Sequence, residues 1–192
     1  MSIRILALIF VISCLGGCAP YVQEYYQINM PGGESKRRCG GPPDVTYFPY
    51  EGIYLEVSIN RSAHYPFFGV DFRVPEGVTA QLKSEWAELV QGPPDNPVRT
   101  QIKLVPIDIG RHTLKNAVQP MVGRTTKRKY LFREEDSHEW FPLTAEQELF
   151  RVKGETGVLV LPDLYVNGTL RSGPRIPFQK SHAFGIVPLN GC

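Results

Sequence analysis

The sequence predicts an all-β protein, an antiparallel β-sandwich with little helix. From Val45 onward, short runs of alternating apolar and polar residues recur, and a period of two is typical of strands with one buried face. Turn-forming residues separate these runs at about the spacing expected of a sandwich or barrel. The chain also contains 17 Pro and 18 Gly among its 192 residues without any period, which argues against an all-helical protein.

The alternation assigns the strands one by one. In the first of them Ile53, Leu55 and Val57 share one face, while Tyr54 and Glu56 occupy the other. Turns follow where Gly, Pro, Asn and Asp gather. The expected strands, in chain order, cover residues 52–59, 68–74, 78–82, 100–107, 129–133, 148–153, 157–166 and 183–189. Such a pattern is compatible with an immunoglobulin-like or transthyretin-like sandwich over residues 45–192.

Two of these segments carry additional signals. Pro162 interrupts the apolar run 157–166, which predicts an edge position or a bulge because proline cannot donate to a sheet. Asn167-Gly168 then predicts a type I′ hairpin turn with both residues at positive φ.

Residues 82–91 allow two interpretations. Leu82, Trp86, Leu89 and Val90 are spaced as on one face of a helix. The same residues can instead form the strand that returns after 78–82.

The amino-terminal 18 residues have the layout of an export signal. Arg4 precedes an uncharged apolar run at residues 5–15. This run is shorter than the roughly 18 residues of a membrane span and fits a cleaved secretory signal. The following Leu15-Gly16-Gly17-Cys18 resembles the lipobox of bacterial lipoproteins, which consists of an aliphatic residue, two small residues and a cysteine.

The resemblance implies that residues 1–17 are removed and that Cys18 becomes the lipidated first residue. Several acyl chains on one cysteine make a stable membrane anchor, because one chain alone binds only marginally. Ala19 follows Cys18, and the lack of Asp at this position implies the outer membrane, with the domain facing the periplasm. The alternative is a plain secretory signal, with Cys18 paired to another thiol.

After cleavage and lipidation, Cys39 and Cys192 remain as a pair, because Cys14 leaves with the signal. An oxidising compartment and flanking glycines favour a disulfide between them; two free thiols are the alternative. Residues 18–44 contain many Gly and Pro and few large apolar groups. We therefore expect residues 18–44 to be a lipidated, flexible tether before the domain at 45–192.

Charge and motifs exclude several function classes. The net charge of +2 argues against nucleic-acid binding. No familiar catalytic or nucleotide-binding motif occurs. The four histidines, His64, His112, His138 and His182, have no ligand spacing. We expect no metal and no cofactor.

Two surface features remain as candidate contacts. The basic residues Arg124, Lys127, Arg128 and Lys129 precede an acidic stretch at 134–136. They predict either a docking site for an acidic envelope partner or two hairpin flanks that pair with each other.

An aromatic group gathers near the start of the domain and consists of Tyr47, Phe48, Tyr50 and Tyr54. These rings predict either a platform for carbohydrate or packing of the first strand over the core.

Together these features predict a non-catalytic cell-envelope lipoprotein whose β-sandwich binds a protein, peptidoglycan or lipid partner. The alternative is a hydrolase that acts on an envelope polymer through a site formed only in three dimensions. A deep pocket with converging acids or a Ser–His pair would favour the hydrolase. A flat surface with an aromatic or basic patch would favour binding.

Overall fold

The computed structural model describes residues 18–36, 45–61, 66–108, 114–130, 133–145 and 155–188. Within these ranges the chain forms strands and no helix, so no helix there is long and apolar enough to cross a membrane. In chain order the strands are β1 (Cys18–Ile28), β2 (Glu34–Lys36), β3 (Val45–Tyr50), β4 (Ile53–Arg61), β5 (Pro66–Val74), β6 (Thr79–Leu82), β7 (Trp86–Gln91), β8 (Val98–Pro106), β9 (Met121–Val122), β10 (Thr125–Tyr130), β11 (Arg133–Ala145), β12 (Thr156–Val160), β13 (Leu164–Val166), β14 (Thr169–Arg171) and β15 (Arg175–Pro188).

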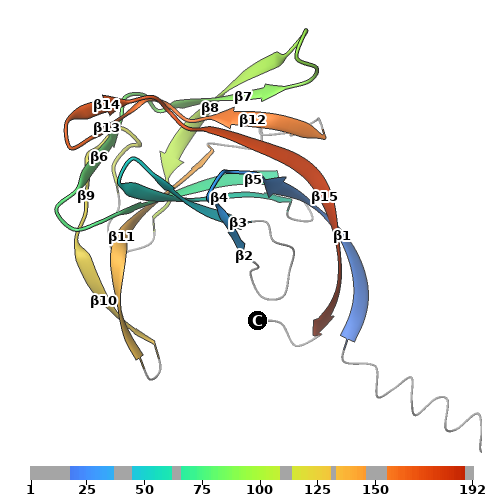
Figure 1. Ribbon diagram of the computed structural model, residues 1–192, viewed down its shortest axis with the longest axis horizontal. Coiled ribbons are helices and arrows are strands. Elements are labelled where there is room, and N and C mark those ends of the chain that lie inside the picture. The colour runs from blue at the N-terminus through green and yellow to red at the C-terminus, as the bar shows by residue number, and fades with distance from the viewer. Residues whose placement is uncertain are drawn as a thin grey trace, which may run out of the picture.

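One sheet folds over on itself to make both layers of a sandwich-like arrangement. Its order is β1-β15-β12-β7-β8-β11-β5-β4-β3-β2, with β10 paired to β11. The fold-over lies where β8 and β11 pair over only three residues each, Leu104–Pro106 and Leu143–Ala145. Figure 1 shows β15, β12, β7 and β8 lying across β5, β4 and β3. The described pairings are antiparallel, and the predicted all-β antiparallel class is confirmed.

The core lies between the two layers and is built by the predicted alternation. On β4 and β5 the apolar positions are at most 1% exposed, namely Ile53, Leu55, Val57, Ile59, Phe68, Val70, Phe72 and Val74. Intervening Tyr54, Glu56, Asp71 and Arg73 are partly exposed. Because successive side chains point to opposite faces of a strand, these polar residues lie on the outer face of the same sheet.

A second, four-stranded sheet has the order β14-β13-β6-β9. The predicted Asn167-Gly168 turn joins β13 to β14, with φ values of 49° and 76°, so this prediction is confirmed. Pro162 falls between β12, which belongs to the large sheet, and β13, which belongs to the small one. The segment 157–166, expected as a single strand, is therefore divided between two strands: β12 in the large sheet and β13 in the small sheet.

Within residues 82–91 the structure has no helix: Leu82 ends β6, and residues 86–91 form the returning strand β7. β7 pairs with β8 on one side and with β12 on the other. Ala87 and Leu89 are buried, whereas Trp86 is exposed, which is a period of two. The helical spacing of Leu82 and Leu89 is therefore coincidental.

The tether prediction is wrong for its first part. β1 pairs along its full length with β15, from Cys18 opposite Pro188 to Ile28 opposite Phe178. Tyr26 contacts the Phe178 ring edge-on, with 5.7 Å between centroids. Tyrosine and β-branched residues favour strands, and most of the Gly and Pro in 18–44 come after Ile28.

Other predictions fall outside the described residues. These are the signal peptide at 1–17, the remainder of the tether at 37–44, the strand at 148–153 and the disulfide between Cys39 and Cys192.

If β1 is part of the folded domain, its buried tyrosine supports stability. Tyr26 is 6% exposed, whereas Val22 on the same strand is 62% exposed. We expect Tyr26→Ala to lower the free energy of unfolding by about 3 kcal/mol, as for other buried aromatics. The matched Val22→Ala should change it by less than about 0.5 kcal/mol. Urea unfolding followed by fluorescence measures the free energy of unfolding of both variants. Equal small losses would contradict a folded β1 and support the flexible tether instead.

Candidate functional site

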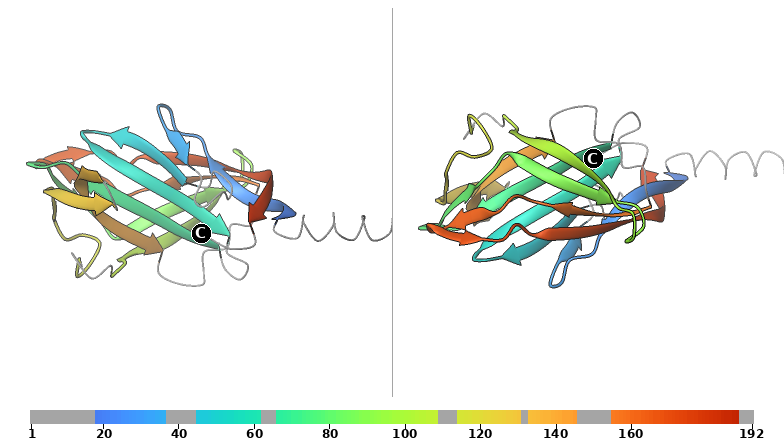
Figure 2. Two further views of the ribbon diagram at one scale, coloured as in Figure 1. Left: turned by 90° about the horizontal axis from the view of Figure 1, so that it is seen from below. Right: turned by 90° about the horizontal axis from the view of Figure 1, so that it is seen from above.

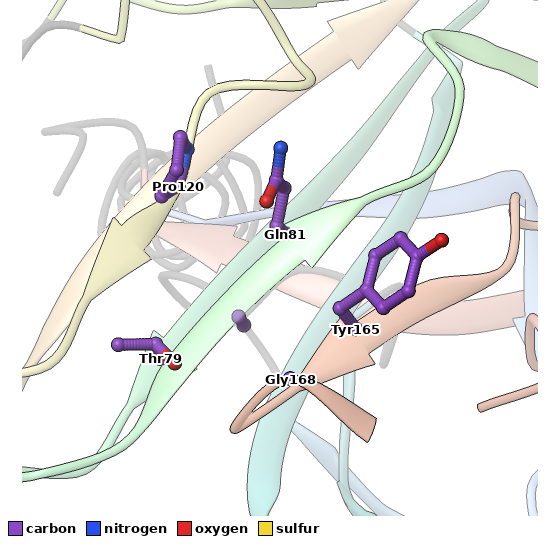
Figure 3. A pocket seen from close by; sticks show the side chains of 6 residues that line it. Thr79, Gln81, Pro120, Tyr165 and Gly168 are labelled. Atoms are coloured by element: carbon purple, nitrogen blue, oxygen red, sulfur yellow. The ribbon is translucent and has the colours of Figure 1, made fainter. Parts of the chain in front are cut away.

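A pocket of about 390 Å³ lies on the outer face of the small sheet. β6 and β13 pair there so that Gln81 is opposite Tyr165 and Ala80 is opposite Val166. Ala80 and Val166 are buried, so the alternating Gln81 and Tyr165 point outward. Figure 3 shows Tyr165 and Gln81 standing on neighbouring strands, with Pro120 across the hollow.

The wall that carries Pro120 is tied to the floor of the pocket. The Gln81 side-chain nitrogen Nε2 donates a hydrogen bond of 2.9 Å to the Val118 carbonyl. The Gln119 side-chain oxygen Oε1 accepts from the backbone N–H of Lys115 at 2.8 Å. These bonds orient the Gln81 amide and leave its Oε1 without a hydrogen bond from the described residues.

The hairpin end of the pocket is equally fixed. The Asn167 side-chain oxygen Oδ1 accepts from the backbone N–H of Thr79 at 2.9 Å. The Asn167 backbone N–H donates to the Thr79 carbonyl, also at 2.9 Å. The predicted turn therefore does more than reverse the chain: it holds the edge of β6 beside Gly168, so the pocket is largely preformed.

The pocket is uncharged and partly apolar. Its lining consists of Thr79, Ala80, Gln81, Pro120, Tyr165 and Gly168. Apolar groups continue around it on the same face, because Leu170 lies opposite Tyr165 and Val122 opposite Thr79. Val122 and Leu170 are each 46% exposed. The site offers an aromatic ring and neutral hydrogen-bonding groups.

A second candidate surface lies on the outer face of β3, β4, β5 and β11, and we call it the arginine–aromatic cluster. The rings of Tyr47 and Tyr54 stack with 5.2 Å between centroids and 9° between planes. The Arg73 guanidinium lies 5.9 Å from the Tyr47 ring centroid and 5.6 Å from that of Trp140. Its terminal nitrogen also contacts a Glu56 carboxylate oxygen at 2.6 Å.

This cluster separates the aromatic residues that the sequence grouped together. Phe48 is buried in the core, while Tyr47 lies on the opposite face of β3. The Tyr50 hydroxyl donates to the Ser172 carbonyl. Sequence reasoning missed Arg73 and Trp140, because only the β5–β11 register places them side by side.

Burial raises the pKa of the Tyr47 phenol above its usual value of 10.0; Tyr54, Glu56 and Glu34 add to the rise and Arg73 opposes it. The stabilisation linked to this shift is present below pH 10 and is lost as pH rises through the folded-state pKa. Tyr47 thus stays neutral under physiological conditions. Because Arg73 is engaged by Glu56 and two rings, we interpret this cluster as a structural lock on the sheet.

The predicted basic contact lies on the β10–β11 hairpin. Arg124 is exposed just before β10. The register places Lys127 opposite Asp136, Arg128 opposite Glu135 and Lys129 opposite Glu134. Opposite charges on directly facing positions stabilise a sheet, and this backbone register is compatible with the alternative that the two flanks pair with each other. Docking of an acidic partner stays a prediction.

The predicted lipid-attachment residue, Cys18, is the first residue of β1. β12 pairs with β15 as far as Gln179, and the Lys180 N–H donates to the Glu155 carbonyl just before β12. Beyond this point, residues 181–188 pair with β1 alone within the described part of the chain. This two-stranded ribbon spans about 26 Å at about 3.3 Å per residue. Figure 1 shows that the ribbon and the β10–β11 hairpin leave the body on the same side. Figure 2 shows the small sheet and β1 at opposite ends of the molecule.

The histidines do not converge. No group of three or more His, Cys, Asp or Glu in the described residues is arranged to hold a metal ion. His182 lies on the ribbon with its Nε2 3.6 Å from a Glu24 carboxylate oxygen. His138 lies in β11, and His64 and His112 fall outside the described ranges.

Comparison of the chain with protein-family models, curated proteins and solved structures finds no match.

The interpretation that Arg73 stabilises the sheet can be tested against a matched arginine–glutamate pair. Arg73–Glu56 and Arg99–Glu88 have the same 2.6 Å separation, but the arginine side chains are 25% and 58% exposed. We expect Arg73→Met to lower the free energy of unfolding by about 2 kcal/mol, because a half-buried pair and two cation–π contacts are lost.

Arg99→Met should cost less than about 1 kcal/mol, as for exposed pairs. Chemical denaturation of both variants decides the matter. Equal costs would show that Arg73 does not lock the sheet.

Proposed function

We propose that this protein is a lipid-anchored lipoprotein of the cell envelope that presents its β-domain for binding and not for catalysis. The membrane is one partner, through lipid on Cys18, and a component of the envelope is the other. The outer membrane, with the domain on its periplasmic side, is the proposed location.

The observation that carries this proposal is the lipobox pattern Leu15-Gly16-Gly17-Cys18 after the short apolar run at residues 5–15. The pattern assigns Cys18 as the first residue of the mature chain. The structure is compatible with this assignment, because β1, which includes Cys18, pairs with β15 along one edge of the large sheet. A lipid at this position would extend from the tip of the ribbon.

The pocket supports binding over hydrolysis. A general acid or base needs a group whose pKa lies near the working pH. The lining offers hydroxyl, amide and ring atoms, and it contains no His, Asp, Glu or Lys, the side chains that most often act as general acids or bases. The hydrolase alternative therefore has no observation in its favour at this site.

Lipidation has a direct test. In a Gram-negative host that expresses the full chain, we expect the protein to sediment with membranes and to incorporate an alkyne-labelled fatty acid. Cys18→Ala should remove both the label and the sedimentation, because no acylated residue remains. Cys14→Ala is the matched control and should change neither. A Cys18→Ala protein that still sediments with membranes, with no label in the parent, would overturn the anchor.

A further inference from the structure

We propose that the pocket on the outer face of the small sheet binds a sugar ring of the cell-wall glycan, with an uncharged N-acetylglucosamine residue as occupant. This inference rests on the proposed function, because it names the envelope component that the anchored domain binds.

The first argument is the match between the lining and the ligand. A sugar ring has an apolar C–H face and a rim of neutral hydroxyls. Tyr165, 36% exposed, offers a ring with an apolar face and a polar tip. The Gln81 Oε1 and the Thr79 hydroxyl offer neutral hydrogen-bonding groups on the adjacent strand. The acetamido group of the occupant supplies an N–H donor for such an acceptor and a methyl group for the apolar rim.

The second argument is charge and size. A lining without Asp, Glu, Lys, Arg or His has nothing to pair with a phosphate or a charged peptide, which is normally held by opposite charge. A volume of about 390 Å³ falls at the small end of ligand sites and suits one ring of a longer chain. The open face over Leu170 leaves the neighbouring rings outside the pocket.

The third argument is position. The ribbon that begins at Cys18 and the small sheet lie at opposite ends of the molecule. On an anchored protein the small sheet that carries the pocket therefore lies at the end of the domain remote from the lipid attachment point. For a domain held at the periplasmic side of the outer membrane, the polymer in that direction is the peptidoglycan layer.

The experiment uses the full chain purified in mild detergent, with two probes. One is purified peptidoglycan sacculi in a co-sedimentation assay, and the other is tri-N-acetylglucosamine in a calorimetric titration. We expect Tyr165→Ala to weaken binding to both by about tenfold, because the stacking ring is lost. Tyr165→Phe keeps the ring and should bind within about threefold of the parent.

Trp86→Ala is the control for exposed aromatic rings in general. Trp86 is 48% exposed on β7 and lies outside the pocket, so its loss should leave binding unchanged. Gln81→Leu keeps the side-chain volume but removes the amide, and it should weaken binding by about fivefold even if Tyr165→Ala unfolds. Thermal unfolding of each variant shows whether a loss of binding is a loss of fold.

Three results would overturn the proposal. The first is that the parent protein binds neither probe. The second is that Tyr165→Ala and Trp86→Ala lose binding equally. The third is that Tyr165→Ala abolishes capture of an envelope protein while sacculi binding persists. None of these affects the anchor, because membrane sedimentation and fatty-acid labelling depend on Cys18. Failure of the pocket and failure of the anchor are thus read separately.

Discussion

The continuous pairing of β15 is the constraint on which the arrangement of the molecule depends. Its first residues pair with β12 in the body of the large sheet, and among the segments that the structure describes its later residues pair only with β1. Phe178 belongs to both parts of β15: it is buried in the core, and its ring contacts Tyr26 of β1. β15 therefore both contributes to the core and pairs with the amino-terminal strand β1.

Local patterns predicted the parts of the fold that depend on local chemistry. The buried faces of β4 and β5 follow from alternation, and the Asn167-Gly168 turn follows from the tolerance of these residues for positive φ. The segment 82–91 could not be assigned in this way, since Leu82 and Leu89 fit a helical stripe and yet alternate with exposed neighbours in two strands. Only pairing of β7 with β8 and β12 decides between them.

The candidate site depends on pairing between residues far apart in sequence, and no local pattern reveals it. Gln81 and Tyr165 become neighbours through the β6–β13 register, and Pro120 arrives on the segment before β9. Likewise, the sequence pattern did not predict β1, because the composition was averaged over residues 18–44. The tyrosines of β1 precede most of the glycines in this segment. An average over the whole segment cannot show that residues 18–28 pair with β15 and residues 34–36 with β3.

The two outer surfaces differ in what their polar groups do. In the arginine–aromatic cluster the charges are already satisfied by one another, since Arg73 is held by Glu56 and two rings. In the pocket the Gln81 side-chain nitrogen is held by the Val118 carbonyl, and the Gln81 side-chain oxygen accepts no hydrogen bond from the described residues. The cluster therefore pairs its charges internally, although Arg73 Nε is buried without a hydrogen-bond partner among the described residues, whereas the pocket leaves an oriented acceptor at the surface.

The ribbon would also limit the motion of the domain if Cys18 carries the proposed lipid. A flexible chain lets a domain sample a volume that grows with linker length. Two hydrogen-bonded strands of about 26 Å would instead hold the domain at a nearly constant height above the point of attachment. Lateral diffusion of the proposed lipid would then carry the pocket through a thin layer parallel to the membrane, so that an encounter with a polymer at that height would become a two-dimensional search.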